Sequence, residues 1–240
     1  MLLAAALLVI SGAKGLNSCL DPTDTVKYKC SPGTTTILFS SCDDLVDADL
    51  PYLQECFDSA GRSEITDIYL DWNSAFTVFP VGMFKDLPAL KNLVVSSPKV
   101  KTLEGGLFND LRSSPLISLG IVFCPELTKL PPDLFKGLDN LGFVRIQRNA
   151  KLTTLPSGLF TDCNKLRVLD LYGNGVESLP SGAFDGLHDV YHLSLISNSL
   201  TTLPADLFEP LESLQQLRLD RMMDIQCVPD SSATYIKLDA

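Results

Sequence analysis

Apolar residues recur along the chain in short stretches in which every second residue is apolar. Each stretch contains one pair of apolar residues two positions apart, and seven pairs follow one another: Ile68 and Leu70, Leu93 and Val95, Leu119 and Ile121, Val144 and Ile146, Leu169 and Leu171, Leu193 and Leu195, Leu217 and Leu219. A two-residue apolar period is that of a strand with one buried face. Only a few residues keep the period in each stretch, so the pattern predicts seven short strands.

A phenylalanine column runs between these stretches. The phenylalanines stand 24 to 27 residues apart, at Phe84, Phe108, Phe135, Phe160, Phe184 and Phe208. The segments before them, such as LPSGLF and LPADLF, are short and contain proline and glycine, which disfavours a long helix. One period therefore holds one strand and one irregular segment, and stacking of the periods predicts a buried phenylalanine spine.

An amide or thiol side chain stands three residues after the second apolar residue in most periods. The residues of this column are Asn73, Cys124, Asn149, Asn174 and Asn198. A chain that turns sharply inside a coil leaves backbone donors and acceptors facing an apolar interior. An asparagine side chain carries both groups and can pair with them. Ser97 or Pro98 and Met222 fill the column in the other two periods, where we expect looser coils.

These columns together resemble the leucine-rich-repeat family, in its extracellular form with about 24 residues per repeat. The matching residues run from Ile65 to Pro229. The resemblance implies an α/β solenoid: a curved leucine-rich-repeat horseshoe with a parallel β-sheet on the concave face and short irregular or 3-10 segments on the convex face. The plant-type LxGxIP signature is absent, and the outer segments are too short for the helical form of the repeat.

The chain divides into four predicted parts. Residues 1–15 are expected to be a signal peptide, because a run of about ten apolar residues is followed by small ones. A buried helix or a membrane anchor is the alternative, although the run is shorter than the roughly 20 residues of a membrane span. Residues 16–63 are expected to be a cysteine-containing cap with a divergent first repeat, residues 64–229 about seven repeats, and residues 230–240 a capping strand or a truncated cap.

The predicted cap combines a strand and a helix. The stretch GTTTILFSSC places Ile37 at the spacing of Ile68, and the stretch after it has an apolar helical stripe, Leu50, Leu53, Cys56 and Phe57. The disulfide candidates are Cys19, Cys30, Cys42 and Cys56. Cys19–Cys30 is the favoured pair, whereas Cys42 and Cys56 are either a second pair or two buried thiols.

Three cysteines fall outside the cap. Cys124 and Cys163 occupy core columns and are expected to be buried, unpaired thiols. Cys227 has no evident partner in the sequence and is expected to be a free thiol or to pair outside this chain.

No catalytic, metal or cofactor site is predicted. The two histidines, His188 and His192, have a helical metal-site spacing but fall on an outer turn and a strand. No phosphate-binding loop or nucleophile motif occurs. The sequence therefore predicts a protein that is not an enzyme and has no cofactor. A formal charge of −10 argues against nucleic acid and anionic membranes, which require an excess of Lys and Arg.

The residues between the buried strand positions should face the concave side. They vary from strand to strand, and the candidates for binding are Tyr69, Asp71, Trp72, Phe123, Phe143, Arg145, Arg148, Asp170, Tyr172, His192, Arg218 and Arg221. Tyr, Trp and Arg are enriched among residues that dominate interface energies. With the resemblance, this favours a secreted, extracellular protein that binds a protein or glycan on its concave face, in recognition, adhesion or defence. The alternatives are a structural component of an extracellular matrix or wall and an enzyme inhibitor.

Overall fold

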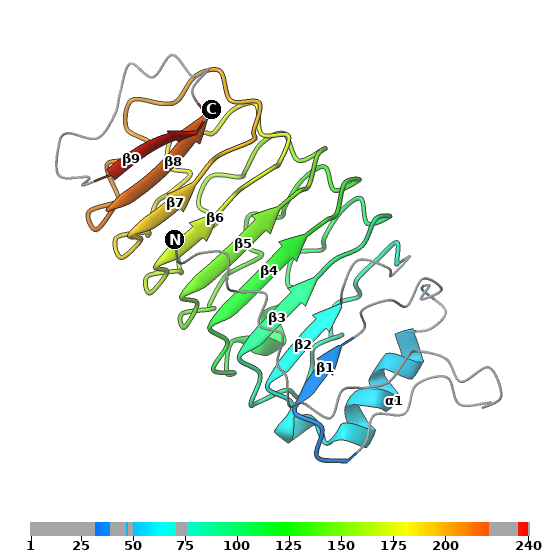
Figure 1. The fold of residues 1–240 in the computed structure, drawn as a ribbon. Coiled ribbons are helices and arrows are strands. Elements are labelled where there is room, and N and C mark those ends of the chain that lie inside the picture. Colours follow the sequence, from blue (N-terminus) through cyan, green and yellow to red (C-terminus); the bar gives the residue numbers. More distant parts are fainter. Residues whose placement is uncertain (1–31, 39–46, 48–49, 71–75, 221–234, 240) are drawn as a thin grey trace.

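The computed structural model describes residues 32–38, 47, 50–70, 76–220 and 235–239. Nine parallel strands form one sheet in chain order (Figure 1). The strands are β1 (Thr36–Leu38), β2 (Asp67–Leu70), β3 (Asn92–Val95), β4 (Ser118–Val122), β5 (Phe143–Gln147), β6 (Val168–Asp170), β7 (His192–Ser194), β8 (Gln216–Asp220) and β9 (Tyr235–Asp239). Strands β2 to β8 lie on the seven apolar stretches, so the seven predicted strands are confirmed.

Neighbouring strands align the apolar columns of the sequence without a shift. Ile68 pairs with Ile37 on one side and with Leu93 on the other, and the same column continues to Leu217. A one-residue slip would turn every buried side chain to the opposite face, so the burial of one face fixes the register. The divergent first repeat predicted at Ile37 is thus the first strand of the sheet.

From β3 to β8, each strand is joined to the next by an irregular outer segment, with a 3-10 helix, η3 (Asn109–Leu111), in one of them. The phenylalanines of these segments are buried in the common core, which confirms the predicted spine. Their rings contact one another across coils: the Phe84 and Phe108 centroids are 5.8 Å apart, and those of Phe135 and Phe160 are 5.7 Å apart. The spine and the inward strand residues form one apolar core between the sheet and the outer wall.

Helix α1 (Leu50–Ala60) covers the N-terminal end of this core, and the 3-10 helix η2 (Arg62–Glu64) follows it. Leu53, Cys56 and Phe57 are buried, as the predicted stripe requires, and Leu50 is half-buried against the core. The exposed end of a solenoid core needs such a cover.

Some sequence predictions fall outside the described residues. The signal peptide, Cys19, Cys30, Cys42 and Cys227 lie there. Cys56 takes part in a disulfide bond whose other cysteine also lies there, so its pairing stays a prediction. Within the described ranges, no helix is both long and apolar enough to span a bilayer.

Candidate functional site: the concave sheet face

The outward side chains of the central strands form two columns on the face of the sheet. Strand β5 shows the alternation clearly, because Phe143, Arg145 and Gln147 reach the surface while Val144 and Ile146 are buried. The register then places Phe143 beside its counterparts on β4 and β6, Ser118 and Val168, and Arg145 beside Gly120 and Asp170. Candidates that are 20 or more residues apart in sequence are therefore neighbours in space.

The chain leaves the central strands through an unusual backbone conformation. The residue before the Asn/Cys column has a positive φ in four successive coils, at Phe123 (53°), Arg148 (55°), Gly173 (74°) and Ser197 (59°). Glycine adopts this left-handed conformation freely, whereas other L-residues pay roughly 1–2 kcal/mol. We call these four residues the left-handed column. Its bulky members, Phe123 and Arg148, lie beside each other.

Backbone hydrogen bonds hold the left-handed column in place. The backbone N–H of Phe123 donates to the carbonyl of Gln147 at 2.9 Å, and that of Arg148 donates to the carbonyl of Tyr172 at 3.0 Å. The sheet ladder thus continues past the strand ends, and the side chains of the column are presented from an ordered backbone.

An asparagine ladder lies directly beneath the left-handed column. The Oδ1 of Asn149 accepts from the Cys124 backbone N–H at 2.9 Å, and the Oδ1 of Asn174 accepts from the Asn149 N–H at 3.0 Å. The Nδ2 of Asn149 donates to the carbonyl of Ile121 at 3.1 Å. Asn149 and Asn174 are buried, so these amides satisfy backbone groups that water does not reach.

The two ends of the described ladder differ from its centre. Cys124 accepts from the Ser97 backbone N–H through Sγ at 3.4 Å. The Oδ1 of Asn198 accepts from the Val176 N–H rather than from the Asn174 N–H. Asn73, the first predicted member, lies outside the described residues.

The Arg148 guanidinium is flanked by two aromatic rings from the neighbouring coils. Its Cζ lies 4.8 Å from the centroid of the Phe123 ring and 5.7 Å from that of Tyr172. Both distances are within the range of cation–π attraction. Neither the Arg148 nor the Arg145 guanidinium forms a hydrogen bond or ion pair within the described part of the chain.

Asp170 is the acidic residue paired in register with Arg145, but its carboxylate is occupied by other donors. Its Oδ2 accepts from Gln147 Nε2 at 2.6 Å, and its Oδ1 accepts from the Tyr172 backbone N–H at 3.0 Å. The electrostatic environment extends to Tyr69. Burial raises the pKa of the Tyr69 hydroxyl and Asp67 raises it further, whereas Arg145 opposes the shift.

The remaining predicted candidates differ in how far their side chains are exposed. Phe143 is 43% exposed, and Arg218 is partly exposed on β8. His192 departs from the expectation of an open contact residue: it is only 3% exposed, and its Nδ1 lies 2.9 Å from Oε1 of Gln216, its neighbour in the register. Asp71, Trp72 and Arg221 lie outside the described residues.

Two exposed apolar residues at the start of the strands were not among the candidates predicted from the sequence. Ile117 is 43% exposed and Tyr191 is 37% exposed, each immediately before a strand. Other periods have Lys91, Arg167 or Gln215 at this position. A large apolar residue in a column that otherwise holds polar residues or glycine (Gly142) was the signal that could have revealed them.

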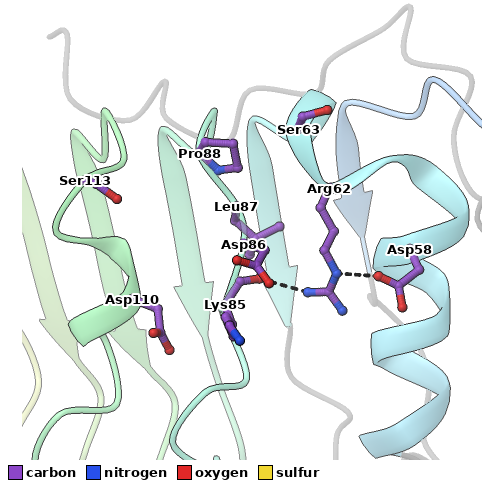
Figure 2. Close-up of a pocket in the computed structure, with 9 residues that line it drawn as sticks. All are labelled: Asp58, Arg62, Ser63, Lys85, Asp86, Leu87, Pro88, Asp110 and Ser113. Carbon is purple, nitrogen blue, oxygen red and sulfur yellow. Dashed lines mark hydrogen bonds and ion pairs between the residues drawn. The ribbon is translucent and has the colours of Figure 1, made fainter.

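A surface pocket of about 610 Å³ lies where the cap meets the first outer segments (Figure 2). Arg62 is one of the lining residues. It forms an ion pair with Asp58, and its Nη1 donates to the carbonyl of Lys85 at 2.9 Å. The guanidinium thus joins helix α1 to the outer wall. Within the described residues, no group of three or more His, Cys, Asp or Glu side chains is arranged to hold a metal.

This architecture alone defines a class of protein: a parallel β-solenoid whose turns are stabilised by an asparagine ladder and whose sheet has one open face. The family model described as "Leucine rich repeat" matches residues 114–176 and 165–221. The chain is a leucine-rich-repeat protein. No curated protein matches it in sequence.

Solved structures share the fold. The structure of a TLR13–ssRNA13 complex is 26% identical with a TM-score of 0.63, covering 74% of this chain and 24% of that one. The Toll–Spatzle complex of Drosophila is 22% identical with a TM-score of 0.57, covering 77% and 27%. Human 5T4, also called trophoblast glycoprotein, is 25% identical with a TM-score of 0.53, covering 66% and 60%. The chain thus spans about a quarter of the first two structures.

Proposed function

We propose that the protein is a secreted recognition module that binds a protein or glycan partner on the concave face of strands β4 to β6 and performs no catalysis. The observation that carries the proposal is a pair of guanidinium groups, Arg145 and Arg148, that have no acidic partner among the described residues of a chain of formal charge −10. Acidic side chains outnumber basic ones in this chain, 29 to 19. Two guanidinium groups on one sheet face that have no acidic partner among the described residues therefore favour an external anionic group.

The location outside the cell is supported by two features of the N-terminal region. The apolar run at the start of the sequence is typical of a signal peptide. The disulfide at Cys56 fits an oxidising compartment, because disulfides persist mainly in secreted proteins.

The solved structures of similar fold support binding of a macromolecule, but they differ in the class of partner. One relative is a complex with ssRNA and another is a complex between Toll and Spatzle. The prediction that charge excludes nucleic acid is therefore unsupported for this fold. The outward residues of this chain still favour a protein or glycan, because Arg145 and Arg148 share the face with Asp67 and Asp170.

The test is capture of partners from extracellular fluid by the full chain and by the double variant Arg145→Glu with Arg148→Glu. A captured partner should bind the double variant at least tenfold more weakly by calorimetry. The matched control, Lys129→Glu with Lys136→Glu, makes the same charge change at exposed residues of the outer segments and should leave the affinity unchanged. Equal loss in both variants, or no loss in the concave variant, would refute the concave site. Self-association without any partner would favour the structural role.

A further inference from the structure

We infer that Phe123, Arg148 and Tyr172 form a clamp for a carboxylate, and that it recognises an Asp or Glu side chain in an extended segment of a protein partner. The inference rests on the proposed function, because it assumes that the concave face binds a partner. It adds the chemical group that is bound and the residues that bind it.

The Arg148 guanidinium is held between two aromatic rings. Rings from the preceding and following coils flank Arg148, at 4.8 Å and 5.7 Å from its Cζ. Rings that cover the faces of a guanidinium leave its edge, which carries the N–H donors, for a ligand. A carboxylate is planar and accepts two parallel hydrogen bonds from that edge. Because the rings restrict the side chain before binding, less conformational entropy is lost when the ligand arrives.

Among the described residues, no acidic side chain competes for the Arg148 guanidinium. Asp170 lies on the next strand, but Gln147 and the backbone of Tyr172 already donate to both of its carboxylate oxygens. Arg148 has no ion pair within the described ranges. Its donors are therefore available to a carboxylate from outside the chain.

The backbone of the clamp also has an uncommon conformation. Phe123 and Arg148 adopt a left-handed conformation that bulky residues rarely take, and strained backbone of this kind clusters at functional sites. The next residue in the column is Gly173, where an added Cβ would lie 3.4 Å from Cγ of Arg148. An alanine there would contact the arginine stem and would be strained by the positive φ of 74°, so a glycine suits the position beside Arg148.

The surroundings favour a peptide over a nucleic acid. A phosphodiester chain needs several cations, whereas this face also carries Asp67 and Asp170. Single-stranded nucleic acid also relies on aromatic rings that are open for base stacking. Here the two rings beside the clamp already face a guanidinium.

An apolar contact at the opposite end of the strands gives the peptide a second anchor. Phe143 and Ile117 are both 43% exposed at the start of β5 and β4. Phe143 precedes Arg148 by five residues, which corresponds to roughly 15 Å along an extended chain. A peptide with an acidic residue and an aromatic residue five positions apart would span both anchors.

The experiment is an NMR titration of the full chain with arginine side chains labelled with nitrogen-15. The probe is a synthetic hexapeptide with acetylated and amidated termini, with phenylalanine at one end, glutamate at the other and serines between. We expect saturable shifts of the Arg148 Nε–Hε signal. The same peptide with glutamine in place of glutamate should bind at least tenfold more weakly, because it lacks the charge.

Substitutions separate a clamp from a general basic surface. Arg148→Lys keeps the charge but loses the two-pronged edge, and should weaken glutamate-peptide binding about tenfold. Phe123→Leu and Tyr172→Leu should each weaken it several-fold while the backbone spectrum keeps the folded pattern. The matched control is Arg112→Lys on the outer wall, which should leave binding unchanged.

Three outcomes would overturn the clamp: no saturable shift at Arg148, equal binding of the glutamate and glutamine peptides, or stronger shifts with a hexathymidine oligonucleotide. The last would assign the face to nucleic acid. Failure of the clamp is distinguishable from failure of the proposed function. A captured partner that is lost in the Arg145→Glu/Arg148→Glu variant but unaffected by Arg148→Lys retains the concave site and rejects the clamp. A partner indifferent to the double variant rejects the concave site itself.

Discussion

The side-chain oxygen of Asn149 accepts a hydrogen bond from the backbone nitrogen of Cys124, one coil earlier, at 2.9 Å. The same amide donates to the carbonyl of Ile121 at 3.1 Å. One side chain therefore satisfies two backbone groups of the preceding coil in a buried position. The coil can turn there without leaving polar groups unpaired in the core.

Asn149→Ala should be strongly destabilising for this reason. The substitution leaves one buried donor and one buried acceptor unpaired, at about 1–3 kcal/mol for each group. We expect a loss of about 3 kcal/mol or more in the free energy of unfolding, measured by urea denaturation. Asn164→Ala is the control, because Asn164 is exposed on an outer segment and its replacement should change stability by less than about 0.5 kcal/mol. Equal urea midpoints for the two variants would show that the asparagine ladder does not contribute to stability.

Phe160→Ala tests the phenylalanine spine. The ring is fully buried and stacks on Phe135 at a centroid distance of 5.7 Å. Truncation removes the transfer free energy of the ring and leaves a cavity, so we expect a loss of about 3–5 kcal/mol in denaturant melts. Phe143→Ala, at an exposed ring, should cost far less. A loss below about 1 kcal/mol for Phe160→Ala would mean that the spine does not carry the core.

The fold could be predicted from the sequence because the same pattern of apolar residues recurs in every repeat. Each strand has the same apolar pair, and a one-residue shift of any strand would turn its own pair to the exposed face. The outer phenylalanines follow the same period. This redundancy is why the seven strands and the register of Ile37 with Ile68 were predictable without a structure.

The binding face was less predictable because the repeat does not determine its outward side chains. In the sequence, His192 and Arg148 both occupy positions predicted to face the concave side. The structure separates them, since His192 is buried against Gln216 while Arg148 lies between two rings. The left-handed backbone at Phe123 and Arg148 was also invisible, because neither residue type signals that conformation.

The buried thiols should make the free energy of unfolding decrease as the pH rises into the alkaline range. Burial raises the pKa of Cys163 to about 12, with Asp162 and Asp139 adding to the shift, and raises that of Cys124 to about 11 although the Ser97 N–H opposes it. The fold therefore favours the neutral thiols. A thiol in the unfolded chain ionises near pH 8.5, so this contribution is complete below that pH and is lost as pH rises toward 11–12.

Cys163→Ala provides the measurement. Removing the thiol should reduce the decline in unfolding free energy above pH 8.5 by up to about 1.4 kcal/mol per pH unit. The comparison uses urea melts of the variant and the unsubstituted chain at pH 7 to 10. Parallel curves for the two chains would show that Cys163 is not held neutral by the fold.

Gly173→Ala should disturb the backbone on which the clamp stands. Gly173 has a φ of 74°, where alanine pays roughly 1–2 kcal/mol, and the added Cβ would lie 3.4 Å from Cγ of Arg148. We expect an unfolding free energy lower by about that amount and a displaced Arg148 Nε signal in the NMR spectrum. Gly142→Ala, immediately before β5, is the matched control. The nearest atom to its added Cβ would be Ile117 Cγ2 at 3.6 Å, an ordinary van der Waals contact. If both variants unfold at the same urea concentration and leave the Arg148 signal in place, the left-handed column has no part in positioning the guanidinium.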